Sequence, residues 1–251
     1  INDAPLDRSD YRPENFGGEF LGPISLKYAL TNSKNLVSLR LYDALGDNIV
    51  LPYIERFGLN STEFPRSDLT VAIGSHALTP LEVASAYTVF ANGGYQVEPY
   101  LITRIDNFND GTIFQAQPLL ACEACESGLD PENQQIPSLY PAPRVIDEDV
   151  AYIMNTMLRS VITSGSGRRI NREIGRSDLA GKTGTTNDNF DLWFSGFNGD
   201  MVTTVYVGYD SPQTLGRDEQ AATVAVPIWI DFMEDALVDS PISTMAQPDG
   251  I

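Results

Sequence analysis

The chain has 251 residues, of which 42% are hydrophobic and 20% are charged, so it can bury a sizeable core in one large domain or two small ones. Its formal net charge of -18 argues against nucleic acid as a partner and against simple docking on an anionic lipid surface, because like charges repel. The sequence holds no run of about 18 apolar residues, so no membrane span is predicted within it.

The first hundred residues are predicted to form short helices after a loop-like opening segment, residues 1–24, that is rich in Pro and Gly. Ser25 is a candidate cap for the first helix, and Thr79 with Glu82 forms a capping box for the last one. Between the first two helices, residues 31–35 are polar and turn-forming, which indicates a break. The predicted helices span residues 25–30, 36–45, 48–57 and 79–91.

The pattern changes after residue 100, where strands and long helices are predicted. Residues 116–144 are rich in Pro, Gln, Ser and acidic residues, which favours an irregular excursion from the domain surface. The closing helix is expected to bend or begin at Pro227. The predicted strands span 100–105, 112–115, the stretch around Lys182, 192–197 and 201–209, and the predicted helices span 147–164 and 223–237. Consecutive strands with tight turns imply an antiparallel sheet covered by helices, hence an α+β fold.

One histidine and two cysteines limit the chemistry that the chain can perform. A mechanism of the Ser-His-Asp or Cys-His type would depend on His76 alone, which we interpret as a surface or capping residue. Cys122 and Cys125 could form a small disulfide, half of a zinc site or a redox pair. The sequence has no second Cys or His pair to complete a zinc ligand set, so we favour a local disulfide in an exported protein.

The segment from Gly181 to Thr185, Gly-Lys-Thr-Gly-Thr, predicts a strand that can bind a ligand. Glycines on both sides of Lys182 leave the backbone uncovered, so a ligand can lie against it. The ammonium of Lys182 suits a carboxylate, the hydroxyls of Thr183 and Thr185 can reach the same group, and backbone N–H groups can face an oxyanion. The alternative is a Thr-rich strand with one solvated lysine.

A second polar triplet, Ser33-Lys34-Asn35, lies in the predicted break between two helices, which can hold its side chains rigidly at a cleft. A serine hydroxyl can relay a proton, and an asparagine amide can bind a peptide carbonyl. An S-x-N triplet alone is common in proteins of this size. The triplet becomes informative because a K-T-G motif follows about 150 residues later, with a hairpin and a terminal helix after it.

This combination resembles the penicillin-binding proteins and serine β-lactamases, whose motif set is S-x-x-K, S-x-N and K-T-G. Further segments resemble the bifunctional class A penicillin-binding proteins, most of all the 1A type of Gram-negative bacteria, and the excursion that holds Cys122 suits that subgroup. These segments run over nearly the whole chain and comprise residues 22–30, 33–40, 79–87, 90–94, 181–187, 191–197, 212–216 and 227–233. The resemblance implies a β-lactamase/transpeptidase-like α+β fold, with an antiparallel sheet flanked by helices.

The activity that the resemblance implies is D,D-transpeptidation of peptidoglycan stem peptides that end in D-Ala-D-Ala, through an acyl-serine that β-lactams mimic. By motif position, Ser33 and Lys182 are the catalytic candidates: Ser33 relays protons, and Lys182 binds the terminal carboxylate together with Thr183 and Thr185. The backbone N–H of Thr185 is expected to form half of the oxyanion hole. The substrate-binding candidates are Asn35, Thr183, Gly184 and Thr185. The resemblance implies no metal and no cofactor.

The nucleophile motif S-x-x-K is missing from the sequence, because the residues three positions before the three lysines are Ile24, Thr31 and Leu179. We therefore expect the nucleophile, the first strands of the sheet, a glycosyltransferase domain and a membrane anchor upstream of Ile1. On this interpretation the chain is the C-terminal part of a transpeptidase domain and is inactive in isolation. Its parts are a helical segment with S-x-N, a hairpin with the cysteine excursion, and the segment around K-T-G, at residues 1–99, 100–145 and 146–251.

The expected partners are stem peptides, β-lactam antibiotics and the N-terminal remainder of the same protein, at the periplasmic face of the bacterial inner membrane. Nucleic acid is not expected, and the membrane is reached only through the anchor. Two alternatives stay open: a non-catalytic penicillin-fold binding module, and a serine β-lactamase or sensor. A serine-lysine pair at S-x-x-K spacing upstream of Ile1 would favour an enzyme. A β-lactamase would also need a deacylating base, which we do not identify in the sequence.

Overall fold

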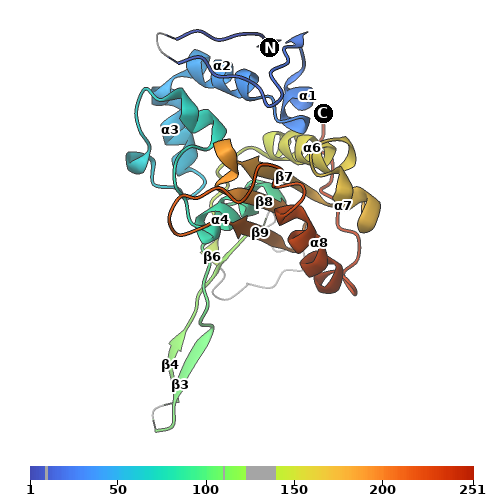
Figure 1. Cartoon of the computed structure of the whole chain (residues 1–251). Coiled ribbons are helices and arrows are strands. Elements are labelled where there is room, and N and C mark those ends of the chain that lie inside the picture. The colour runs from blue at the N-terminus through green and yellow to red at the C-terminus, as the bar shows by residue number, and fades with distance from the viewer. Residues whose placement is uncertain (9–10, 110, 123–139) are drawn as a thin grey trace.

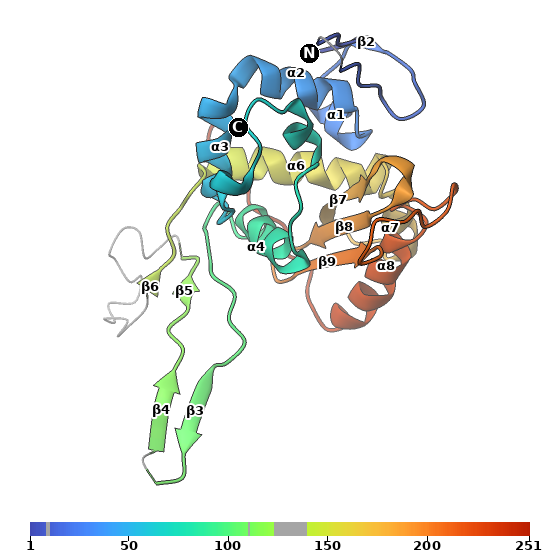
Figure 2. The ribbon, with the colours of Figure 1, turned by 60° about the vertical axis from the view of Figure 1, so that its left-hand side comes forward.

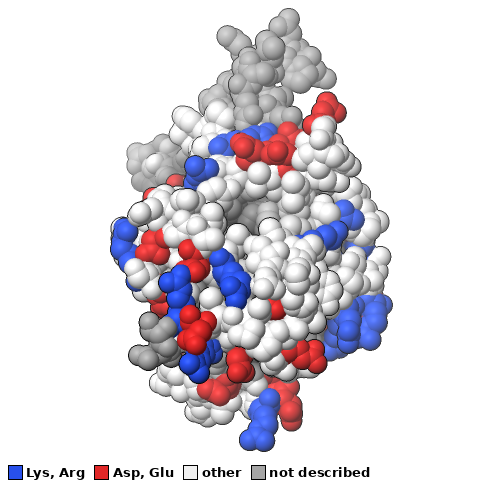
Figure 3. All heavy atoms as spheres, turned by 90° about the horizontal axis from the view of Figure 1, so that it is seen from above, with Lys and Arg blue, Asp and Glu red and all other residues white. Residues whose placement is uncertain are grey.

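The computed structural model describes residues 1–8, 11–109, 111–122 and 140–251. In this part of the chain, helices surround an antiparallel sheet, and a long β-hairpin extends away from the body that holds the sheet (Figures 1 and 2). No helix within the described ranges is long and apolar enough to cross a membrane. Basic side chains are interspersed among acidic ones on the face seen in Figure 3, so the acidic excess forms no single patch there.

The N-terminal part consists of helices, in agreement with the sequence pattern, and of a short strand pair within residues 1–24, which were predicted to be loop-like. Ser25 caps the first helix by accepting a hydrogen bond from the backbone of Tyr28, and the predicted capping box between Thr79 and Glu82 is present. The elements are β1 (Asn2–Asp3), β2 (Gly22–Pro23), α1 (Leu26–Thr31), α2 (Asn35–Leu45), α3 (Asp47–Glu55), the 3₁₀ turns η1 (Ser61–Glu63) and η2 (Leu69–Ile73), and α4 (Pro80–Ala91).

The protruding hairpin is formed by β3 (Arg104–Asn107) and β4 (Gly111–Gln115). Its first strand begins four residues later than the sequence suggested, because residues 100–103 make no ladder in the described chain. The segment predicted to be wholly irregular contributes a short parallel pair, β5 (Leu119–Leu120) with β6 (Tyr140–Pro141). Cys125 lies outside the described residues, so the local disulfide stays a prediction.

The C-terminal part builds the sheet and its covering helices. Strands β7 (Ala180–Thr185), β8 (Leu192–Phe197) and β9 (Val202–Val207) form an antiparallel sheet in the order β7-β8-β9, which confirms the α+β prediction. The other elements are α6 (Glu148–Ser164), α7 (Arg168–Glu173), the 3₁₀ turn η3 (Asn187–Asn189) and α8 (Ala225–Ala236). Helix α7 was missed, because its six residues are too few for a helical period to be recognised.

The main core lies between the sheet and α8. Trp229 is fully buried, and its ring meets Phe194 of β8 edge-on with centroids 5.1 Å apart. Its indole Nε1 donates to the carbonyl oxygen of Thr203 at 3.1 Å, so the polar atom of this large side chain is paired. Gly196 permits this packing, because a Cβ there would lie 2.7 Å from the Trp229 ring. Helix α8 thus packs on one face of the sheet, in which β7 is an edge strand.

Candidate active site

The K-T-G strand and the S-x-N triplet meet in the fold. Lys182 Nζ donates a hydrogen bond to Ser33 Oγ at 2.8 Å, although 149 residues separate the two in the sequence. Lys182 is supplied by β7, and Ser33 is supplied by the turn between α1 and α2. Asn35, the first residue of α2, is partly buried. Its amide has no hydrogen-bond partner among the described residues, so it is free to bind a ligand.

Ser33 has a left-handed backbone, with φ of 52°, at the end of α1. The N–H of Lys34 bonds the carbonyl oxygen of Ala29 at 2.9 Å, and that of Ser33 bonds Leu30 at 3.2 Å, which is the Schellman pattern. Glycine usually occupies this position, because a side chain there costs about 1–2 kcal/mol. The turn nevertheless holds a serine, and its hydroxyl meets Lys182. Strained backbone of this kind occurs preferentially at functional sites.

The ammonium of Lys182 is partly buried and has no carboxylate partner in the described part of the chain. Burial lowers its pKa from 10.5 to about 8, because desolvation penalises the charged form. Its second hydrogen bond goes to the carbonyl oxygen of Thr183 at 2.9 Å. A cation that is desolvated yet unpaired favours an incoming anion, and a carboxylate fits that requirement.

The outer edge of β7 is open among the described residues, since the strand pairs only with β8. The Thr183 carbonyl accepts from Lys182, so we infer that it faces this open edge and not the ladder with β8. Backbone groups two residues apart on a strand face the same side, which directs the N–H of Thr185 to the open edge as well. That N–H is therefore available to an oxyanion.

The two threonine hydroxyls of the strand already have partners. Thr183 Oγ1 lies 2.6 Å from the Oγ of Ser166, and Thr185 Oγ1 accepts from the N–H of Ala221 at 3.2 Å. Gly184 lies against Trp193, and a Cβ at this glycine would lie 3.2 Å from that side chain. Sequence reasoning missed Ser166. The Ser-Gly-Ser-Gly run of residues 164–167, at the end of the predicted helix, could have signalled it.

A buried ion pair anchors the segment that leads into β7. The side chain of Asp178 is fully buried and pairs with Arg176 at 2.7 Å. It also accepts from the backbone N–H of Ser243 at 3.0 Å and from Asn198 at 3.4 Å. Burial alone would raise the pKa of Asp178, but these hydrogen bonds outweigh it and lower the pKa below its ordinary value. The network fixes the start of the strand that carries Lys182.

The histidine prediction is corrected by the structure. His76 neither caps α4 nor lies freely on the surface. Its ring is partly buried and packs on Phe64 with centroids 4.2 Å apart, and its buried Nε2 has no hydrogen-bond partner. Among the described residues, no group of three or more His, Cys, Asp or Glu side chains could hold a metal ion.

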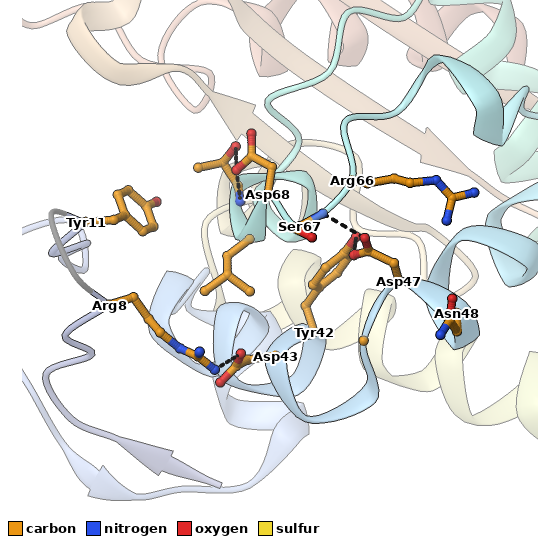
Figure 4. Close-up of a pocket in the computed structure, with 12 residues that line it drawn as sticks. Arg8, Tyr11, Tyr42, Asp43, Asp47, Asn48, Arg66, Ser67 and Asp68 are labelled. Carbon is orange, nitrogen blue, oxygen red and sulfur yellow. Dashed lines mark hydrogen bonds and ion pairs between the residues drawn. The ribbon is translucent and has the colours of Figure 1, made fainter.

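A separate open pocket of about 850 Å³ lies at the C-terminal end of α2, the end opposite Asn35 (Figure 4). Several of its polar and charged side chains are paired with each other. Arg8 forms an ion pair with Asp43, and the carboxylate of Asp47 accepts a hydrogen bond from the Tyr42 hydroxyl at 2.9 Å. Burial and this hydrogen bond raise the pKa of Tyr42 to about 12. Arg66 at this pocket has no ion-pair partner among the described residues, but the pocket is lined by neither Ser33 nor Lys182.

Known proteins resemble this chain in sequence and in fold. The chain is 45% identical to penicillin-binding protein 1A of Pseudomonas aeruginosa and 42% identical to that of Neisseria lactamica, and each alignment covers the whole chain but only 34% and 30% of the relative. A crystal structure of penicillin-binding protein 1A from Haemophilus influenzae superposes with a TM-score of 0.88 at 32% identity, over 99% of this chain and 40% of that one.

The penicillin-binding protein PonA1 from Mycobacterium tuberculosis shares the fold, with a TM-score of 0.79 at 22% identity, over all of this chain and 66% of that one. The chain thus spans about a third of the length of the curated relatives that it matches. The family model for the penicillin-binding protein transpeptidase domain matches residues 6–234. The chain therefore belongs to the penicillin-binding protein transpeptidase domain family.

Proposed function

We propose that this chain forms part of a serine-type D,D-transpeptidase, an acyltransferase that cross-links peptidoglycan stem peptides ending in D-Ala-D-Ala. The observation that carries the proposal is the desolvated Lys182, which has no described counterion and donates to Ser33 at the open edge of β7. A cation beside a hydroxyl and free backbone N–H groups suits a ligand with a carboxylate and a carbonyl that becomes an oxyanion.

In this reaction a serine oxygen attacks the penultimate D-Ala carbonyl, and the bond to the terminal D-Ala nitrogen breaks. Ser33 relays the nucleophile's proton to the departing amine. An amine of a neighbouring stem peptide then attacks the acyl-serine, an amide forms, and the serine hydroxyl is restored with the amine's proton. Asn35 binds the substrate amide, and the N–H of Thr185 faces the oxyanion. Lys182 and the hydroxyls of Thr183 and Thr185 bind the terminal carboxylate. Gly184 leaves the strand surface uncovered for the substrate.

We assign the nucleophile to residues outside this chain, because no serine stands three positions before a lysine in it. The N-terminal remainder of the same protein is the partner that supplies the nucleophile. A β-lactam acylates that serine because it mimics the D-Ala-D-Ala end. The site of action is the periplasmic face of the bacterial inner membrane, with the anchor outside this chain.

The test is acylation of the full-length protein by a fluorescent penicillin, with Lys182→Ala compared with Lys27→Ala. Lys27 is exposed on α1 and serves as the matched control. Losing a charge-assisted contact costs about 1.5–3 kcal/mol, so we expect the second-order rate constant of acylation to fall about 10- to 150-fold for Lys182→Ala only. Equal kinetics in the wild type and the Lys182 variant would refute the assignment.

Intact-mass spectrometry places the nucleophile. We expect an adduct of one penicillin molecule on the full-length protein and none on residues 1–251 alone. An adduct on the isolated chain would show that the nucleophile lies within it. No adduct on a folded full-length protein would favour the non-catalytic binding module, and rapid release of a hydrolysed drug would favour a β-lactamase.

A further inference from the structure

The loop between α6 and α7, residues 165–167, contacts the K-T-G strand and the end of the helix that precedes the S-x-N triplet. Gly165 packs on the last residue of α1, since a Cβ there would lie 2.2 Å from the carbonyl oxygen of Thr31, two residues before Ser33. On the next residue, the hydroxyl of Ser166 lies 2.6 Å from that of Thr183. The loop therefore lies between the end of α1, which leads into the S-x-N turn, and the strand that holds K-T-G, and it contacts both.

The two hydroxyls form a hydrogen bond at the short end of the usual O–H···O range, and either oxygen could be its donor. A bound carboxylate removes this ambiguity, because an ionised carboxylate only accepts hydrogen bonds. Thr183 must then give its proton to the ligand, and Ser166 must give its own proton to Thr183 Oγ1. In this arrangement the hydrogen bond from Ser166 fixes the orientation of the Thr183 hydroxyl, so that the Thr183 hydrogen points at the ligand.

We propose that Ser166 is a positioning residue, which orients the Thr183 hydroxyl for the carboxylate of the substrate or of a β-lactam. The inference rests on the proposed function, because it takes that carboxylate as the ligand of Thr183. Ser166 itself does not contact the ligand. Without the Ser166 hydroxyl, the Thr183 hydroxyl can rotate and donate its hydrogen bond to another acceptor. This weakens recognition of the carboxylate and leaves the rest of the site intact.

The experiment measures second-order acylation rate constants in the full-length protein for a penicillin and for its methyl ester, which lacks the carboxylate charge. The variants are Ser166→Ala, Thr183→Val and the double substitution. Ser164→Ala is the matched control, because the Ser164 hydroxyl, two residues away, bonds the carbonyl oxygen of Ser160 at 3.1 Å. Ser166→Thr keeps the hydroxyl and tests rescue. Thermal unfolding verifies that each variant is folded.

Losing one oriented hydrogen bond should lower the rate for the free acid about three- to tenfold in Ser166→Ala, while the rate for the ester changes less than twofold. Thr183→Val should show the same selective loss, and the double variant should be no worse than the more damaged single variant, because the two hydroxyls act as one unit. Ser164→Ala should match the wild type, and Ser166→Thr should retain most of the preference for the acid.

Equal losses for acid and ester in Ser166→Ala, or additive losses in the double variant, would overturn the proposal, since Ser166 would then act on general structure or touch the ligand independently. An unchanged acid rate would overturn it as well. These outcomes are distinct from failure of the proposed function, which would appear as a wild-type protein that penicillin does not acylate.

Discussion

The pH dependence of acylation tests the charge state in which Lys182 acts. Burial lowers the pKa of Lys182 from 10.5 to about 8. If the ammonium binds the ligand carboxylate, acylation must decline as the pH rises through that value, because the amine form carries no charge. If the neutral amine acted as a base instead, acylation would rise over the same window. The sign of the slope therefore separates the two roles.

The expected magnitude follows from the fraction of charged lysine. With a pKa of about 8, roughly nine-tenths of the side chains are charged at pH 7 and roughly one-tenth at pH 9, a tenfold decline. With the ordinary pKa of 10.5, more than about 95% would stay charged at pH 9 and the decline would be negligible. The pKa shift thus predicts an alkaline limb that an unperturbed lysine would not produce.

The assay is stopped-flow acylation of the full-length protein by a fluorescent penicillin between pH 6 and pH 9.5, corrected for hydrolysis of the drug. Lys182→Arg is the matched control, because a guanidinium stays charged throughout this range. Its rate constant should be lower overall but should decline less than twofold over the window. A wild-type profile that is flat or rises up to pH 9.5, or an identical limb in Lys182→Arg, would refute the reasoning.

Two further predictions concern the site and its support. Ser33→Ala should slow the acylation step about 100-fold or more while pre-acylation binding of penicillin changes little, whereas Asn35→Ala should damage both. Rapid-mixing kinetics separate the two constants, and a Ser33→Ala effect confined to binding would exclude the relay role. Asp178→Asn should lower the free energy of unfolding by about 3 kcal/mol at pH 7, because it leaves Arg176 partly buried without its counter-charge. The pKa of Asp178 is depressed in the folded state, so the wild type should lose this stability only as the pH falls through that lowered value. Urea unfolding of both proteins at pH 7 and at acid pH measures this, and a variant as stable as the wild type at pH 7 would contradict it.

Local sequence determined the elements that depend on neighbouring residues. The capping box of Thr79 and Glu82 predicted the start of α4, because its hydrogen bonds close within one helical turn. Strand periodicity and a tight turn predicted β8 and β9 for the same reason. The prediction that the strand around Lys182 binds a ligand rests on its glycines and its cation, which are also local features.

Only the tertiary structure decided what that strand touches. The bond between Lys182 and Ser33 joins residues 149 positions apart, and no local preference encodes so distant a contact. The lowered pKa of Lys182 depends on burial, which is a property of the assembled fold. The contact of Ser166 with Thr183 likewise needs the end of α6 to meet the edge of β7. The sequence thus supplied the chemical groups of the site, and packing set the distances and charge states on which their chemistry depends.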